Sequence, residues 1–284
     1  MGPVVSVLAN PIVAAGVAVA TIAGLLTRQP RRSTNIDPGC AERAGKSQEQ
    51  LLEEARQRYG VNTSDHFNVA FVGLSGSGKS SLINAFRHIK NNDIRQPELD
   101  ANGNRFGAAK TGETETTTEI KRYDFEEVPR LKLWDSMGGG TVRAGRDNFF
   151  ENHQFYAFDA IVVVTAGRFT EFDLDLIRDA LKWKKTVALV RSKADVDILN
   201  RANNAGIDVK NVDKAAYRRD VERNIHGDMD RFGMAELKRI PIFIVSDVVV
   251  RGGSPNRPKE VYGMDEDRLR EHVVQGIVQQ RFPQ

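Results

Sequence analysis

The sequence predicts an α/β fold with a mostly parallel central sheet and helices on both faces. Two observations carry this prediction. Short apolar runs typical of buried strands alternate along the chain with amphipathic helical patterns. Several of those runs end directly in polar or glycine-rich motifs, and such motifs meet at the carboxyl edge of a parallel sheet. At 284 residues the chain suits one large domain or two small ones.

The overall charge and cysteine content narrow the classes of partner. The chain has 41 Lys and Arg against 38 Asp and Glu, a net charge of +3, so we expect no nucleic-acid partner. Cys40 is the one cysteine, which excludes an internal disulfide. This composition suits a reducing, cytoplasmic environment.

The amino-terminal segment, residues 1–28, predicts an apolar helix. It has no charged side chain before Arg28, and a run of about 20 apolar residues is enough to cross a bilayer. Arg31 and Arg32 follow, and positive flanks stay cytoplasmic, so we expect the rest of the chain on the cytosolic face of an intracellular membrane. Two alternatives are a small-residue helix packed on protein, and myristoylation of Gly2, which the rigid ring of Pro3 disfavours.

A linker and then the main domain follow this segment. Residues 29–46 are rich in Pro, Arg, Ser and Gly, a composition typical of linkers. Ser47 and Gln50 match a capping box, which predicts a short amphipathic helix ending at Gly60. We therefore predict one domain over residues 47–284.

The main motif of this domain is G-L-S-G-S-G-K-S at residues 73–80, between a strand (67–72) and a helix (81–86). This is the phosphate-binding P-loop, whose backbone N–H groups and helix N-terminus hold a di- or triphosphate. We expect Lys79 to reach the β- and γ-phosphates and the Ser80 hydroxyl to bind Mg²⁺. The predicted nucleotide contacts in the loop are Gly76, Ser77, Gly78, Lys79, Ser80 and Ser81.

Two loops that sense the γ-phosphate are predicted downstream. A threonine-rich stretch at 109–119 precedes a strand at 119–125, which is where a GTPase keeps switch I. A short strand at 131–135 ends in Asp135, and Asp135 opens a D-x-x-G motif. We expect Asp135 to hold Mg²⁺ and the Gly138 N–H to contact the γ-phosphate.

The base-recognition motif is expected after the later strands. A buried strand at 160–165 and a helix at 170–183 lead to a strand at 186–190, followed by S-K-A-D. This is similar to [NT]-K-x-D, with Ser192 in place of Asn or Thr. Asp195 would accept two hydrogen bonds that guanine donates and adenine cannot, and the Lys193 stem would lie on the purine.

The last predicted elements are a helix at 213–231, a strand at 241–245 and a closing helix at 264–280. Ser246 follows the strand, and we expect its backbone N–H to brace the guanine. The fold is therefore predicted to be a Ras-like P-loop GTPase domain that uses GTP, GDP and Mg²⁺.

Hydrolysis of GTP is the expected activity, and we expect it to be slow. Gly139 stands where many small GTPases have a water-orienting glutamine. One alternative is therefore a membrane-tethered GTP switch or scaffold that does not hydrolyse GTP. A second alternative, an ATP-using P-loop enzyme such as a small kinase, is disfavoured by Asp195.

Taken together, the motifs resemble those of the immunity-related GTPases. The resemblance spans residues 49–280 and is carried by A-A-K-T-G at 108–112, L-W-D at 133–135, R-F at 168–169 and S-K-A-D at 192–195. It covers the G domain without the family's usual carboxy-terminal helical domain. It implies GTP binding, slow hydrolysis and nucleotide-dependent self-association, as a homodimer or oligomer, on membranes. By matching positions it implies that Thr117 is the switch I magnesium ligand and that Glu115 takes part in hydrolysis within the dimer. The expected catalytic residues are therefore Lys79, Glu115 and Thr117.

Overall fold

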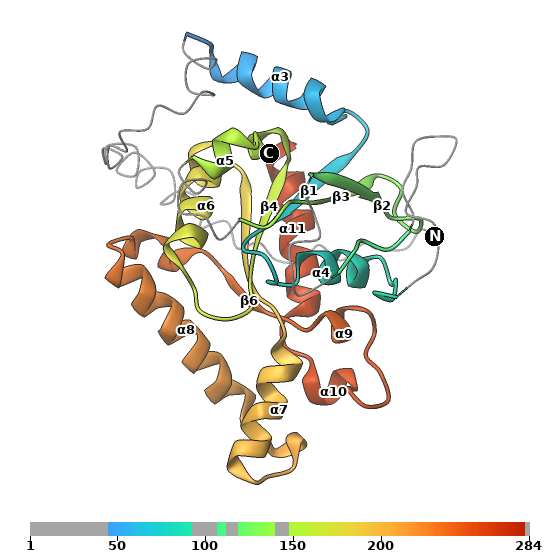
Figure 1. Cartoon of the computed structure of the whole chain (residues 1–284), viewed down its shortest axis with the longest axis vertical. Coiled ribbons are helices and arrows are strands. Elements are labelled where there is room, and N and C mark those ends of the chain that lie inside the picture. Colours follow the sequence, from blue (N-terminus) through green and yellow to red (C-terminus); the bar gives the residue numbers. More distant parts are fainter. Residues whose placement is uncertain (1–44, 93–106, 112–118, 140–147, 282–284) are drawn as a thin grey trace, which may run out of the picture. The chain divides into compact units, whose positions relative to one another are not determined.

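The computed structural model describes residues 45–92, 107–111, 119–139 and 148–281, which lie in one compact unit of the chain. Its centre is a six-stranded sheet of order β2-β3-β1-β4-β5-β6 (Figure 1). β2 runs antiparallel to β3, and all the other neighbouring strands are parallel. The predicted mostly parallel α/β fold is confirmed. The strands are β1 (Phe67–Val72), β2 (Lys121–Asp124), β3 (Leu131–Asp135), β4 (Ala160–Thr165), β5 (Thr186–Arg191) and β6 (Ile242–Ile244).

Helices follow the strands in the order that the sequence predicts. The longer ones are α3 (Gln48–Tyr59), α4 (Lys79–Phe86), α6 (Glu171–Lys182), α7 (Ala194–Ala205), α8 (Lys214–Arg231) and α11 (Glu266–Arg281). Short ones are α5 (Phe149–Asn152), α9 (Asp247–Val250) and α10 (Lys259–Tyr262), with 3₁₀ turns at Phe155–Ala157, Val209–Asn211 and Ala235–Arg239. The predicted capping box at Ser47 is present, and α3 ends at a left-handed Gly60. A second capping box, Thr170 with Asp173, starts α6.

Side-chain alternation along the strands builds two cores, one on each face of the sheet. Ala70 and Val72 of β1 belong to the core that contains residues of α3, α5, α6 and the end of α8, whereas Val69 and Phe71 belong to the core that contains residues of α4 and α11. Both faces of a parallel sheet are then covered, which explains why β4 is buried at every position.

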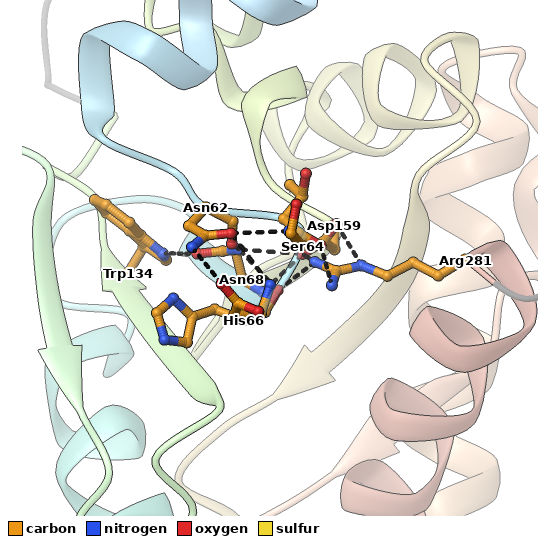
Figure 2. Close-up of polar contacts among 9 residues, drawn as sticks. Asn62, Ser64, His66, Asn68, Trp134, Asp159 and Arg281 are labelled. Atoms are coloured by element: carbon orange, nitrogen blue, oxygen red, sulfur yellow. Dashed lines mark hydrogen bonds and ion pairs between the residues drawn. The ribbon is translucent and has the colours of Figure 1, made fainter.

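The amino edge of the sheet is held by a group of four residues that we call the amino-edge cluster: Asn68, Trp134, Asp159 and Arg281 (Figure 2). Asp159 Oδ2 accepts from the Asn68 backbone N–H at 2.7 Å, and Trp134 Nε1 donates to Asn68 Oδ1 at 3.1 Å. Arg281, at the end of α11, donates to Asp159 and to the carbonyls of Thr63 and His66. The cluster therefore fastens the last helix to β1 and β4.

Some predictions fall outside the described residues. These include the apolar segment 1–28, nearly all of the linker at 29–46 and most of the threonine-rich stretch at 109–119. Among the described residues, no helix is both long and apolar enough to cross a membrane. Two predicted strands are shorter than expected: β2 begins at Lys121 instead of residue 119, and β6 covers three residues.

Candidate functional site

The P-loop joins β1 to α4 and needs glycine at two points. Gly73 has φ 142°, and a Cβ there would lie 2.3 Å from the Val164 carbonyl oxygen of β4. Gly78 has φ 94° and is the N-cap of α4. The loop therefore turns tightly against the sheet and continues directly into the helix N-terminus, the geometry that binds phosphate.

Lys79 lies inside this loop. Its side chain is buried, and Nζ donates to the carbonyl oxygens of Gly73 at 3.2 Å and Leu74 at 2.9 Å. An ammonium held by loop carbonyls on a flexible stem is positioned to exchange those contacts for phosphate oxygens.

Ser80 and Asp135, two of the three predicted Mg²⁺ ligands, are in contact. The Ser80 hydroxyl donates to Asp135 Oδ2 at 2.6 Å, and Asp135 is fully buried at the end of β3. Hydroxyl and carboxylate oxygens suit Mg²⁺, which proteins usually hold with one or two side chains plus phosphates and water. The described residues contain no group of three or more His, Cys, Asp or Glu that would form an all-protein metal site. The pair therefore fits a cation shared with a phosphate ligand.

The D-x-x-G loop lies directly against the P-loop. Gly139 donates its N–H to the Gly73 carbonyl at 3.1 Å and forms a parallel bridge with Leu74. A Cβ at Gly138 would lie 2.6 Å from the Ser75 backbone nitrogen, so only glycine allows this approach. The backbone that follows Asp135 is thus brought to the phosphate-binding loop. Glu115 and Thr117 lie outside the described residues.

The S-K-A-D motif contacts the P-loop through two side chains. The Ser192 hydroxyl donates to the Ser77 carbonyl at 2.6 Å, so serine makes a bond to the P-loop at the place of the usual Asn or Thr. Lys193 has φ 60°, rare for a residue with a side chain, and its Nζ donates to the Gly76 carbonyl at 3.2 Å. Strained backbone of this kind collects at functional sites.

Asp195, the last residue of this motif, and Ser246, which follows β6, are both buried. The sequence did not predict their hydrogen-bond partners. Asp195 is 1% exposed, and Arg257 donates to its Oδ2. The Ser246 N–H, which we expected to brace guanine, instead donates to Glu266 Oε1 at 3.0 Å. In this structure the Ser246 N–H is therefore not available to a base. The reason is that α11 packs against the end of β6 and places Glu266 there, a contact that the local sequence does not predict.

Two buried hydroxyls mark where further polar partners fit. Ser77 Oγ and Ser246 Oγ are buried and have no hydrogen-bond partner among the described residues. Buried polar groups in folded proteins are normally satisfied by protein, water or ligand. Ser81, in the first turn of α4, is different, because its hydroxyl accepts from Asn91 at 3.4 Å. The orphaned hydroxyls are consistent with a polar ligand at this edge of the sheet.

Sequence reasoning missed Arg257 and Glu266. Burial raises the pKa of Glu266, although its carboxylate accepts backbone N–H groups from Ser246 and Met264. No sequence pattern points to Glu266. A signal for Arg257 was present in R-G-G-S-P-N-R-P at 251–258, because two glycines and two prolines predict a constrained loop.

Structural comparison finds solved structures with only a low overall similarity to this chain. The bacterial selenocysteine-specific elongation factor EF-Sec matches with a TM-score of 0.42 at 16% identity, over 75% of this chain and 29% of that one. The S. thermophilus NFeoB structure bound to GDP.AlF4⁻ gives a TM-score of 0.41 at 15% identity, over 75% of this chain and 64% of that one. At these scores the likeness adds nothing to the strand order and motifs described above.

Sequence comparison is more specific. Residues 53–252 match the family model of the interferon-inducible GTPases (IIGP). Interferon-inducible GTPase 1 of Mus musculus is 33% identical over 184 residues, 65% of this chain and 40% of the relative. Interferon-inducible GTPase 5 of Rattus norvegicus is 28% identical over 73% of this chain and 40% of the relative. The chain thus spans about two fifths of the length of these relatives. Because the family model covers most of the sequence, the chain belongs to the interferon-inducible GTPase family.

Proposed function

We propose that this protein binds GTP and GDP with Mg²⁺ and hydrolyses GTP slowly. One observation carries the proposal: Ser192 and Lys193 each hydrogen-bond a P-loop carbonyl. These two bonds tie the motif that contains the buried Asp195 to the loop that contains Lys79. A phosphate-binding loop and a base-reading carboxylate, joined in this way, match the two ends of one guanine nucleotide.

Each residue then has a defined task. Lys79 exchanges its loop carbonyls for the β- and γ-phosphates, and the P-loop amides bind the remaining phosphate oxygens. Ser80 and Asp135 hold Mg²⁺, which when bound neutralises charge on the phosphates. Asp195 accepts the guanine N1–H and N2–H, and adenine would leave this buried carboxylate without those donors.

Slow hydrolysis and self-association form the finer part of the proposal. Gly139 offers no side chain to orient water, and Gly139 lies against Phe172 so closely that a Cβ there would meet the ring at 2.2 Å. We propose that Thr117 completes the Mg²⁺ shell when GTP is bound, and that Glu115 is held in place for hydrolysis when two GTP-bound copies associate. Specific activity should then rise with protein concentration, whereas turnover independent of concentration would contradict a dimer mechanism.

Titration calorimetry with GDP, GTP and ATP in the presence of Mg²⁺ tests nucleotide binding. We expect heat with GDP and GTP and none with ATP. Lys79→Ala should weaken binding by about 100-fold or more, the scale of losing a charge-assisted contact with phosphate. Asp195→Asn should lose guanine and gain xanthine nucleotides, because the new amide donates to the xanthine C2 carbonyl. Folded wild-type protein that gives no heat with either guanine nucleotide would contradict the proposal.

The second candidate function is a GTP-dependent switch or scaffold without hydrolysis, favoured by the absence of a side chain at Gly139. A single-turnover assay separates the two functions. Loss of γ-phosphate from bound GTP in the wild type, but not in Lys79→Ala, supports the GTPase. Intact GTP after prolonged incubation of concentrated wild-type protein supports the switch.

We further propose that the protein works at the cytosolic face of an intracellular membrane, which it contacts through residues 1–28. The support is the uncharged, apolar composition of that segment and the arginines that follow it. Cell fractionation of the full chain and of a deletion of residues 2–27 tests the proposal. We expect the full chain in the membrane fraction and the deletion in the soluble fraction; a deletion that stays bound to membranes contradicts it.

A further inference from the structure

We propose that Arg257 competes with the guanine base for the carboxylate of Asp195, so that nucleotide binds only when this ion pair opens. The inference rests on the proposed function, since it gives Asp195 the role of reading guanine. It adds a residue that limits the affinity of the site.

The contact itself is an ion pair of unequal exposure. Arg257 Nη1 donates to Asp195 Oδ2, and the two side chains are 36% and 2% exposed. A buried carboxylate is costly without a donor, so some group must hold it in every state of the site. The guanidinium, by contrast, can turn into solvent at little cost, because a third of it is already exposed.

The loop presents Arg257 in a restricted conformation. Ser254 and Arg257 exchange two backbone hydrogen bonds, of 3.0 and 2.9 Å, around a turn that contains Pro255. Pro258 follows and restricts the Arg257 backbone further. Gly253, with φ 85°, packs so closely that a Cβ would lie 3.3 Å from the Arg257 carbonyl. Because the backbone of this turn is already fixed, less conformational entropy is lost when Arg257 pairs with Asp195.

Guanine and Arg257 would both donate hydrogen bonds to the carboxylate of Asp195. The base uses N1–H and N2–H together, and this needs both oxygens of the Asp195 carboxylate. Arg257 already occupies Oδ2. Binding of the base therefore replaces an ion pair with two hydrogen bonds from uncharged donors to the carboxylate, and the cost of breaking the ion pair is subtracted from the affinity.

Arg218 provides a control of similar exposure, and its aspartate, Asp265, also accepts from Arg268 at 2.7 Å. Arg218 donates to Asp265 Oδ1 at 2.6 Å, with exposures of 27% for the arginine and 1% for the aspartate. The exposures are nearly those of the Arg257 pair, but none of the nucleotide motifs contributes to the Arg218 pair. Loss of Arg218 should therefore affect stability without changing nucleotide affinity.

The experiment measures GDP association and dissociation in the full chain with Mg²⁺, for the wild type, Arg257→Ala, Arg257→Gln and Arg218→Ala. We expect both Arg257 variants to bind GDP about five- to tenfold more tightly, mainly through faster association. Their melting temperature should fall without nucleotide and recover with saturating GDP. Arg218→Ala should keep the wild-type affinity.

The possible results lead to different conclusions. Tighter binding by Arg257→Gln supports the competition even where Arg257→Ala does not fold. Equal or weaker binding by the folded Arg257 variants overturns the inference and leaves the proposed function intact. Wild-type protein that binds no guanine nucleotide contradicts the proposed function itself, and with it the role of Asp195.

Discussion

Buried polar residues lie at both the amino edge and the carboxyl edge of the central sheet, but their hydrogen-bonding groups find partners in different ways. At the amino edge, Asp159 receives donors from Asn68 and Arg281, and Trp134 donates to Asn68. At the carboxyl edge, the hydroxyls of Ser77 and Ser246 are buried without a partner among the described residues. Asp195 is held there by an arginine that is one-third exposed.

This difference in hydrogen bonding suggests a structural role for the amino-edge cluster and a ligand-binding role for the polar residues at the carboxyl edge. A buried network whose members satisfy one another rigidifies the fold and offers nothing to a ligand. Polar atoms that the protein leaves unpaired, or pairs with an exchangeable group, weaken the fold and are available to a ligand. Substitutions at the amino edge should therefore change stability, and those at the carboxyl edge should mainly change nucleotide affinity.

The largest effect is expected at Asp159. Asp159→Ala leaves the largely buried Arg281 without its carboxylate and the Asn68 N–H without an acceptor. We expect a loss of about 3–5 kcal/mol in the free energy of unfolding, measured by urea denaturation. The affinity of the remaining folded protein for GDP should not change. Asp267→Ala, which removes an exposed ion pair with Lys259, should cost less than about 0.5 kcal/mol. Similar costs for the two variants would contradict a structural role for the cluster.

Lys185, near the amino-edge cluster, predicts a pH dependence. Burial is the main reason that the pKa of Lys185 is lowered from its ordinary 10.5 to about 8. The charges of Arg56 and Arg281 act in the same direction, and the charge of Asp159 opposes the shift. Between about pH 8 and 10.5 the unfolded chain holds the proton and the folded chain does not, so this residue makes stability rise with pH.

At neutral pH, therefore, the buried charge destabilises the fold, and Lys185→Met should add about 3 kcal/mol at pH 7. The advantage over wild type should shrink as pH rises from 8 to 10.5, measured by denaturation at several pH values. The exposed Lys184→Met is the control and should show no such trend. A constant advantage across this range would argue against titration of Lys185.

Ser192 should affect both properties moderately. Ser192→Ala removes the 2.6 Å hydrogen bond to the Ser77 carbonyl and leaves that acceptor buried. We expect a stability loss of about 1–2 kcal/mol and a roughly tenfold weaker affinity for GDP, because the base motif is no longer fixed to the P-loop. Ser192→Thr keeps the hydroxyl and should retain most of the affinity. If Ser192→Ala bound GDP as tightly as the wild type, the hydrogen bond between the S-K-A-D motif and the P-loop would have no role in nucleotide binding.

The smallest change in stability is expected at Ser246. Ser246→Ala removes a hydroxyl that has no partner among the described residues, so the melting temperature should stay the same or rise slightly. GDP affinity should nevertheless fall by a few-fold if the hydroxyl meets the nucleotide. Thermal melts with and without GDP measure both quantities. A large drop in melting temperature without nucleotide would place Ser246 with the structural residues.

Short-range sequence signals predicted most of the fold. The P-loop, the capping box at Ser47 and the apolar strands depend on backbone conformation and on residues within a few positions, so their patterns are readable locally. The same holds for Lys79, Ser80 and Asp135, which stand at the ends of predicted strands or the start of a predicted helix. The glycine motifs after them specify turns that other residues cannot make.

Contacts between distant residues came from the tertiary structure alone. Arg257 and Asp195 are 62 positions apart, and Arg281 and Asp159 are 122 apart. Glu266 takes the Ser246 N–H because α11 packs beneath β6. By itself, the sequence predicted the strands of a mostly parallel sheet, the P-loop and the place of Asp195 directly after the strand β5. Which donor holds that aspartate depends on how the loop at 251–258 packs, because no local pattern fixes the distance between side chains far apart in the chain.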